Sequence, residues 1–174
     1  MNPYYRGDSY DIVKRFFCEA LRTLGYAVYI EPMFTGEWSG IDADFYAFLG
    51  VKHVRNFESN HSRTALFIDP DKGVSGRVSV MHTSFDRLAQ SLEQHTIVFA
   101  FDQSFSRSSK PKEKEQMVRK LAELKSRGCE AFYYDSHARF LFASRTGNDL
   151  QALQDHLHSL GLPESRILPC PKHL

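Results

Sequence analysis

The sequence predicts an α/β fold in which helices flank an open, mostly parallel sheet. Short β-prone runs alternate along the chain with segments whose apolar residues recur every three or four positions, a pattern typical of strands alternating with amphipathic helices. Two of the runs, 65–68 and 97–101, are apolar at every position, which indicates strands that are covered on both faces, as in a parallel sheet. The 174 residues contain no long linker, so a single domain over residues 1–174 is expected.

A first helix and a first strand are predicted before residue 33. Asp8 or Ser9 can cap the helix, because apolar residues follow at spacings of three and four. Gly25 stands where a glycine commonly ends a helix. The β-prone run 27–30 comes next and stops at Pro32, since proline cannot continue the ladder of hydrogen bonds.

The next elements are a short helix, a buried strand and a third helix. Residues 33–40 are expected to form a loop and 41–49 a short helix, whereas 51–63 are polar and are expected to form a loop. The buried strand 65–68 is followed by a stretch without clear pattern. Thr83 is then expected to cap the next helix, which carries apolar residues at helical spacing.

The C-terminal part is expected to add an antiparallel hairpin to the sheet. Pro111 suits the first turn of a helix that ends near Gly128. The strands 131–134 and 140–143 are joined by too few residues for a parallel crossover, so they should pair antiparallel. A last helix and a short edge strand at 167–168 complete a Rossmann-like, mostly parallel sheet.

The bulk composition excludes several classes of protein. The net charge is +1, so the whole chain has no electrostatic preference for nucleic acid. Three cysteines without a Cys-x-x-Cys pair argue against a disulfide framework and against a zinc knuckle. The sequence shows neither an apolar signal-peptide core nor a membrane-length apolar run. We therefore expect a cytoplasmic protein with no membrane partner.

Carboxylates follow three of the predicted strands. Glu31 follows the first strand, Asp69 and Asp71 follow the second, and Asp102 follows the third. Ligands of open α/β sheets bind beyond the carboxyl ends of the strands, so these side chains are expected to converge on one edge of the sheet. The alternative is that the aspartates only form turns, which their side chains stabilise by bonding to the backbone.

The segment from Asp69 to Gly73 has the residues of a metal site. Two carboxylates separated by one proline can face the same cation, and Mg²⁺ or Mn²⁺ is commonly held by carboxylates together with substrate phosphates. Lys72 and Gly73 would allow a phosphate to approach. In this hypothesis Asp69, Asp71 and Asp102 are catalytic and bind the metal together with Glu31.

Two motifs resemble a family of large-subunit ribosomal-RNA adenine-N6 methyltransferases. The run from Gly7 to Lys14 resembles the Gly-Asn-x-x-Asp-x-x-Lys helix start of that family, and Ile68-Asp69-Pro70-Asp71 resembles its Asp-Pro-Pro-Tyr type motif. The expected C-terminal hairpin is similar to the one that closes class I methyltransferase sheets. The resemblance implies S-adenosylmethionine as cofactor and nucleic acid as partner. The cofactor-binding residues would be Glu31, Thr35, Gly36, Pro70 and Gly73.

A second resemblance is to Toprim domains, the metal-dependent catalytic domains of topoisomerases, primases and some nucleases. Glu31 after one strand, Asp69 and Asp71 after the next, and Gly73 shortly afterwards follow the order of the Toprim motif. This resemblance implies a Mg²⁺- or Mn²⁺-dependent nuclease or phosphoryl-transfer enzyme. A third hypothesis remains, in which the same scaffold is a non-catalytic binding or regulatory module.

Overall fold

The fold is taken from a computed structural model, which describes residues 6–34, 42–58, 60–76, 79–105 and 110–171. The helices are α1 (Ser9–Thr23), α2 (Asp42–Leu49), α3 (Phe85–Ser91), α4 (Lys110–Lys125) and α5 (Gly147–Ser159), with 3-10 turns at Val54–Asn56 and Glu164–Arg166. The strands are β1 (Ala27–Pro32), β2 (Lys52–His53), β3 (Thr64–Asp69), β4 (Gly73–Ser75), β5 (His82–Ser84), β6 (Ile97–Phe101), β7 (Glu130–Tyr134), β8 (Phe140–Ser144) and β9 (Ile167–Pro169). Together they form the α/β architecture that the sequence predicts.

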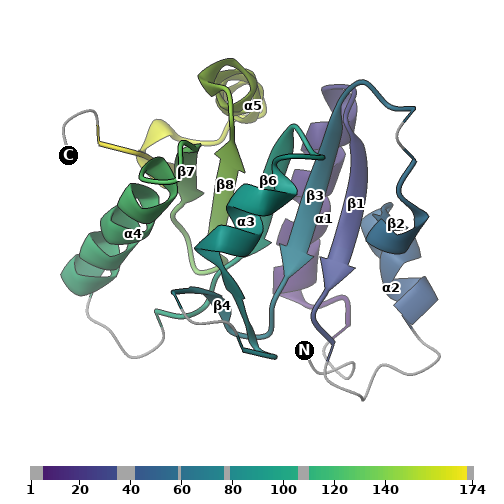
Figure 1. Cartoon of the computed structure of the whole chain (residues 1–174), viewed down its shortest axis with the longest axis horizontal. Helices are drawn as coiled ribbons and strands as arrows, with labels where there is room; N and C mark the ends of the chain where they lie inside the picture. Colours follow the sequence, from purple (N-terminus) through teal and green to yellow (C-terminus); the bar gives the residue numbers. More distant parts are fainter. Residues whose placement is uncertain (1–5, 35–41, 59, 77–78, 106–109, 172–174) are drawn as a thin grey trace.

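The central sheet has seven strands in the order β2-β1-β3-β6-β8-β7-β9, and β4 and β5 form a separate two-stranded ribbon (Figure 1). Neighbours from β2 to β6 pair in parallel. Strand β8 is antiparallel to both β6 and β7, and β9 is antiparallel to β7. Strand β7 therefore runs in the direction of β6, and the sheet is mostly parallel, as expected.

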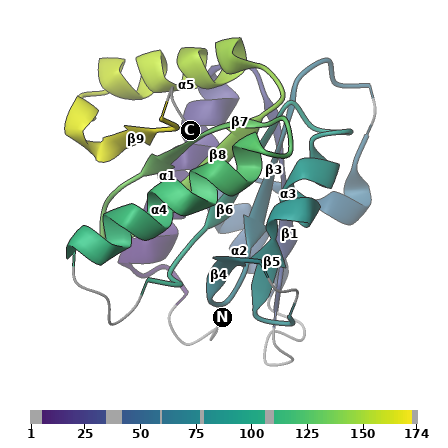
Figure 2. The ribbon, with the colours of Figure 1, turned by 60° about the vertical axis from the view of Figure 1, so that its left-hand side comes forward.

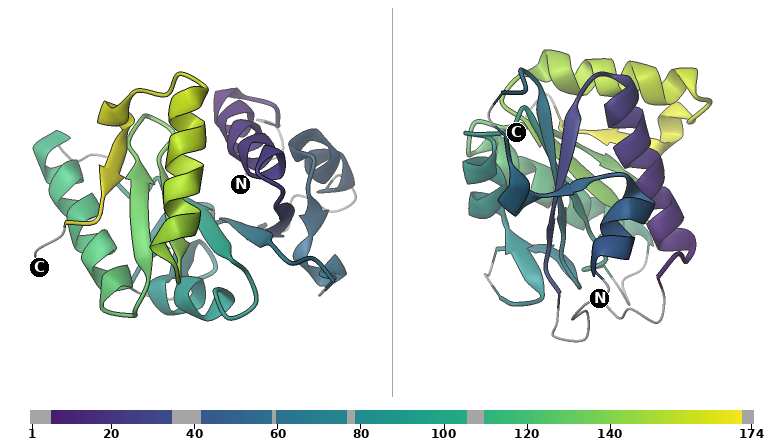
Figure 3. Two further views of the ribbon diagram at one scale, coloured as in Figure 1. Left: turned by 90° about the horizontal axis from the view of Figure 1, so that it is seen from above. Right: turned by 90° about the vertical axis from the view of Figure 1, so that its right-hand side faces the viewer.

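Helices cover both faces of the sheet. One face packs against α1, α2 and α5, and the other packs against α3 and α4 (Figures 2 and 3). A row of stacked aromatic rings crosses four strands on the first face. Phe67 lies 4.8 Å from Phe99, Phe99 lies 5.3 Å from Phe142, and Phe132 lies 4.8 Å from Phe142, measured between ring centroids. Each such pair contributes about 0.5–1.5 kcal/mol beyond the burial of its area, so the row helps to fix the register of these strands.

Three local expectations need correction or refinement. Asp8 caps α1, as one of the two expected residues. Ser84, the last residue of β5, caps α3 in place of Thr83, because the Ser84 hydroxyl accepts the backbone N–H of Arg87. The segment 51–63 is not all loop, since it contains the two-residue strand β2. A strand of this length is fixed by its backbone pairing to β1, which leaves little trace in the side chains.

The chain leaves neighbouring strands β1 and β3 in opposite directions. From β1 it passes through α2 to β2 at one side, and from β3 it passes through the ribbon and α3 to β6 at the other. The helices of these two connections cover opposite faces of the sheet. The ends of β1 and β3 therefore form the kind of switch point at which open α/β sheets bind ligands. We call the edge where β1, β3 and β6 end the carboxyl edge.

A buried histidine at the opposite edge gives the fold a pH dependence. His95 is only 5% exposed, packs against the rings of Tyr29 and Phe57, and lies 3.1 Å from the Thr64 hydroxyl. Burial lowers the pKa of His95 below its ordinary value of 6.5, and the charge of Arg87 adds to this while Glu31 opposes it. Because the unfolded chain binds this proton more tightly, the stabilising contribution is present above pH 6.5 and is lost as the pH falls.

We predict that the free energy of unfolding falls between pH 7.5 and pH 5, with a slope from this group of at most about 1.4 kcal/mol per pH unit. The His95→Phe variant should lack that part of the slope, because Phe keeps the ring contacts and carries no titrating group. Urea unfolding of both proteins across this range measures the difference. Parallel pH profiles for the parent and the variant would contradict the assignment.

Candidate functional site

The strand-end carboxylates lie at one edge of the sheet but on opposite faces. Ile68 is aligned with Ala100 in the β3–β6 ladder, so Asp69 and Asp102 occupy positions of opposite orientation, since successive side chains on a strand alternate between faces. Asp69 points to the face covered by α1, where it meets Lys14. Asp102 points to the face covered by α4, where it meets Lys120. The expected single cluster of carboxylates is therefore divided in two by the sheet.

On the α1 face, a buried lysine lies between two carboxylates. The Lys14 ammonium is 3.0 Å from Asp69 and 2.9 Å from Asp11, and the three side chains are 4%, 1% and 5% exposed, respectively. The ammonium also lies 5.6 Å from the ring centroid of Phe45 and 5.0 Å from that of Phe101. Burial lowers the pKa of Lys14, but the two carboxylates outweigh burial and hold that pKa above its ordinary value. Lys14 is therefore a permanent cation.

One oxygen of Asp69 has no hydrogen-bond partner among the described residues. Oδ2 accepts from Lys14 at 3.0 Å, whereas Oδ1 is buried and accepts from no described donor. Burial raises the pKa of Asp69, and Lys14 opposes this shift. An unsatisfied buried polar atom costs on the order of 1–3 kcal/mol, and more for a charged group, so such an atom is a strong indication of a missing donor.

On the α4 face, Asp102 is fully buried and accepts five hydrogen bonds. Its Oδ1 accepts from the Val74 N–H at 3.1 Å, the Ser104 N–H at 3.2 Å and the Ser104 hydroxyl at 2.7 Å. Its Oδ2 accepts from the Lys120 ammonium at 2.6 Å and the Tyr133 hydroxyl at 2.7 Å. We call these five residues the Asp102 network. Its carboxylate is saturated, in contrast to that of Asp69.

The same contacts show that Ser104 is not an activated nucleophile in this arrangement. The Lys120 ammonium donates three hydrogen bonds. Its Nζ lies 2.6 Å from Val74 O, 2.6 Å from Asp102 Oδ2 and 2.5 Å from Ser104 Oγ. Burial lowers the pKa of Lys120, and the adjacent Asp102 carboxylate opposes the shift. Lys120 thus donates to Ser104 and accepts nothing from it, while the Ser104 proton points to a saturated carboxylate. These bonds join the ribbon, α4 and β7 to the end of β6.

The remaining predicted site residues are dispersed. Glu31 is half-buried and pairs with Arg87 of α3 at 2.8 Å. Pro70 is buried and Asp71 is half-buried. Thr35 and Gly36 lie outside the described residues. Within the part of the chain that the structure describes, no three His, Cys, Asp or Glu residues are grouped so that they could hold a metal ion. The metal-binding role of Glu31, Asp69, Asp71 and Asp102 therefore remains a prediction.

Four residues of the site were not singled out as functional by sequence reasoning: Lys14, Ser104, Lys120 and Tyr133. Lys14 did carry a signal, since it ends the run that resembles the methyltransferase helix start. Lys120 also carried one, because it lies between Met117 and Leu121 on the inward arc of α4, where an unpaired lysine would be costly. Tyr133 lies inside an apolar strand and showed no such signal.

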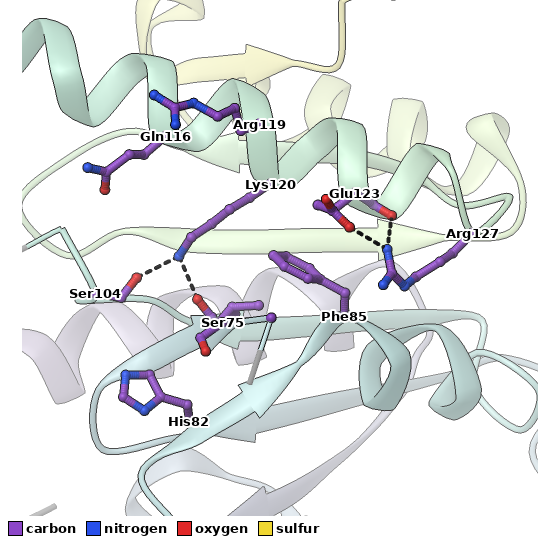
Figure 4. A pocket seen from close by; sticks show the side chains of 11 residues that line it. Ser75, His82, Phe85, Ser104, Gln116, Arg119, Lys120, Glu123 and Arg127 are labelled. Carbon is purple, nitrogen blue, oxygen red and sulfur yellow. Dashed lines mark hydrogen bonds and ion pairs between the residues drawn. The ribbon is translucent and has the colours of Figure 1, made fainter. Parts of the chain in front are cut away.

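A cleft opens beside the Asp102 network, between the ribbon and α4 (Figure 4). Its volume is about 640 Å³. Ser75, Gly76 and His82 line the ribbon side, and Lys120 reaches across from α4 toward Ser104. The network thus forms the inner wall of the cleft.

Gly73 is required where the ribbon meets Asp102. Its φ is +119°, and a Cβ at this position would lie 2.1 Å from Asp102 Oδ1 and 2.9 Å from Asp102 Cα. We predict that Gly73→Ala lowers the free energy of unfolding by about 2–4 kcal/mol, from backbone strain and overpacking together. Denaturant unfolding measures the loss. Gly76→Ala is the matched control, because nothing lies within 4 Å of its Cβ position and no positive φ is involved. An equal effect of the two substitutions would show that the contact with Asp102 is unimportant.

Comparison with known proteins adds no identification. The sequence matches no protein-family model, and neither the curated proteins nor the solved structures include a significant match. None of the described helices has both the length and the apolar character needed to cross a membrane. The function of the chain is therefore argued from the geometry of its own site.

Proposed function

We propose that this chain is a methyltransferase-like domain that binds S-adenosylmethionine at the carboxyl edge between β1 and β3 and acts on nucleic acid. The observation that carries the proposal is the buried Oδ1 of Asp69, which has no hydrogen-bond partner among the described residues. Lys14 donates to the other oxygen and favours the ionised form of this carboxylate, against the burial that raises the pKa of Asp69. A ligand with an amino or hydroxyl donor would satisfy the remaining oxygen, and an adenosyl cofactor carries both kinds of group.

The position of Asp69 supports a ligand site over a purely structural ion pair. Asp69 is the last residue of β3 and is aligned with Pro32, the last residue of β1. The two strands are the pair between which the connections diverge, and this is where open α/β sheets hold nucleotides and related ligands. A residue placed there with an unused acceptor suits ligand recognition, because a purely structural pair gains stability when all its atoms are bonded.

The strand order supports the likeness to class I methyltransferases. The reversed strand β8 is inserted between β6 and β7, and it forms with β7 the hairpin on which part of the resemblance depends. The helix start that resembles the methyltransferase run supplies Lys14, and the Asp-Pro motif supplies Asp69. The two motifs of the resemblance are far apart in the sequence, yet their side chains form one ion pair of 3.0 Å. In the proposed Rossmann-like fold, both motifs therefore belong to a single site.

We predict that isothermal titration calorimetry detects binding of S-adenosylmethionine to the parent protein and that Asp69→Asn weakens it by at least about tenfold, as expected for loss of a hydrogen bond to a charged acceptor. Asp155→Asn makes the same chemical change at an exposed position of α5 and should bind like the parent. Circular dichroism verifies that each variant is folded. Absence of binding to the parent at millimolar cofactor would refute the proposal.

The metal-dependent alternative predicts a different response. Glu31, Asp69 and Asp102 each pair with a basic side chain, so a cation shared among them would have to displace those partners. If Asp71 nevertheless helps to hold a metal, Mg²⁺ or Mn²⁺ should raise the Tm of the parent, and Asp71→Asn should abolish the increase without lowering the metal-free Tm. We expect no metal-induced shift. A shift that Asp71→Asn removes would favour the nuclease or phosphoryl-transfer hypothesis over methyl transfer.

A further inference from the structure

We infer that the cleft between the β4–β5 ribbon and α4 binds the sugar–phosphate backbone of a single nucleic-acid strand. The inference rests on the proposed function only in taking nucleic acid as the substrate, and it adds the surface that would hold that substrate. It follows from the shape of the cleft, from the charge of the helix that borders it and from its place at the end of β6.

Two adjoining hollows lie along α4. The cleft of about 640 Å³ is lined by the ribbon and by the inner side of α4. A second hollow of about 580 Å³ lies along the same helix and is lined by Pro111, Lys114, Glu115, Val118 and Arg119. Arg119 borders both hollows. The two together form an extended track with an arginine at their junction, which suits a linear polymer.

The helix that borders the track, α4, has a higher net charge than the chain as a whole. In the sequence KPKEKEQMVRKLAELK of α4, six side chains are basic and three are acidic, whereas the whole chain has a net charge of only +1. Lys120 is neutralised by the buried Asp102, and this still leaves α4 with two excess positive charges. The local excess is therefore concentrated on the helix that borders the cleft, as expected for a surface that attracts phosphates.

The cations at the rim differ in how readily they can change partner. Arg119 and Glu115 are 3.6 Å apart and are 75% and 65% exposed, so their pair is weak and a phosphate can replace the carboxylate. Arg127 is held by Glu123 and Asp86, each at 2.7 Å, and is expected to keep these partners. Lys114 and Arg119 are therefore the residues that we assign to phosphate contact.

The cleft favours backbone recognition over base recognition. Phe85 is 5% exposed and packs in the core beneath the cleft, so it offers no stacking platform, and the half-buried imidazole of His82 is the remaining aromatic ring among the described lining residues. The inner wall, formed by Ser104 and Lys120, lies at the end of β6, the strand next to β3. A strand bound in the cleft would thus pass the end of β6, the neighbour of β3, on the face of the sheet opposite to the one where Asp69 meets Lys14.

The test is fluorescence anisotropy with a fluorescein-labelled uridine 20-mer, which forms no stable secondary structure. The double variant Lys114→Glu/Arg119→Glu reverses both assigned cations. The control Arg15→Glu/Lys52→Glu makes the same change of net charge on α1 and β2. Arg15 is a suitable match for Arg119, because it is half-exposed and pairs with Glu19 at 3.9 Å, as Arg119 pairs with Glu115 at 3.6 Å. We expect the cleft variant to bind at least about tenfold more weakly, with a salt dependence reduced by about two phosphate contacts, and the control to change less than twofold.

Equal weakening in both variants would assign the binding to net charge alone and overturn the inference, as would a parent that does not bind the 20-mer at low salt. The calorimetric titration with S-adenosylmethionine separates this failure from failure of the proposed function. Cofactor binding without nucleic-acid binding refutes the cleft and leaves the cofactor site standing. Binding of the 20-mer that depends on Lys114 and Arg119, without any binding of the cofactor, supports the cleft and refutes the methyltransferase proposal.

Discussion

The arrangement of this protein depends on two buried lysine–aspartate pairs that tie helices to the same edge of the sheet from opposite faces. Lys14 joins α1 to the end of β3, and Lys120 joins α4 to the end of β6. Each lysine crosses from a helix to a carboxylate that would otherwise be buried without a counter-charge. Removing one partner from such a pair typically costs about 3–5 kcal/mol, because the other charge is left buried. The pairs therefore fix where α1 and α4 lie along the carboxyl edge.

The two pairs differ in the number of hydrogen bonds that their carboxylates accept. Asp102 accepts five hydrogen bonds and has no capacity left for a ligand. Asp69 accepts from Lys14 through one oxygen, and its other oxygen has no partner among the described residues. The electrostatics also differ, because Lys14 lies between two carboxylates and Lys120 faces one. Asp69 is thus a buried carboxyl group beside a lysine ammonium, with one oxygen that accepts no hydrogen bond from the described residues.

The sequence predicts where the main strands lie, but it does not predict to which face of the sheet the carboxylates at the strand ends point. The runs 65–68 and 97–101 were identifiable because burial on both faces leaves an uninterrupted apolar pattern. Whether Asp69 and Asp102 share a face depends on the alignment of Ile68 with Ala100, which is a property of the paired strands and not of either run. Strand β2 and the ribbon were missed because short strands are held by backbone bonds that any residue can make. The pairing of Lys120 with a buried carboxylate was indicated only by its position among the apolar residues on the inward side of α4.

The Asp102 network also explains why a three-residue strand outside the main sheet keeps a fixed position. Strand β4 pairs only with β5, so its other side would present unpaired backbone groups. The Val74 N–H donates to Asp102 and the Val74 carbonyl accepts from Lys120, so both of its backbone groups are bonded to β6 and α4 through side chains. Gly73 permits this close approach because a Cβ would occupy the space of the carboxylate. These bonds hold the ribbon against the end of β6 and α4, so the wall of the cleft on this side is fixed by contacts within the chain. A surface preformed in this way would lower the entropy that binding of a partner has to overcome.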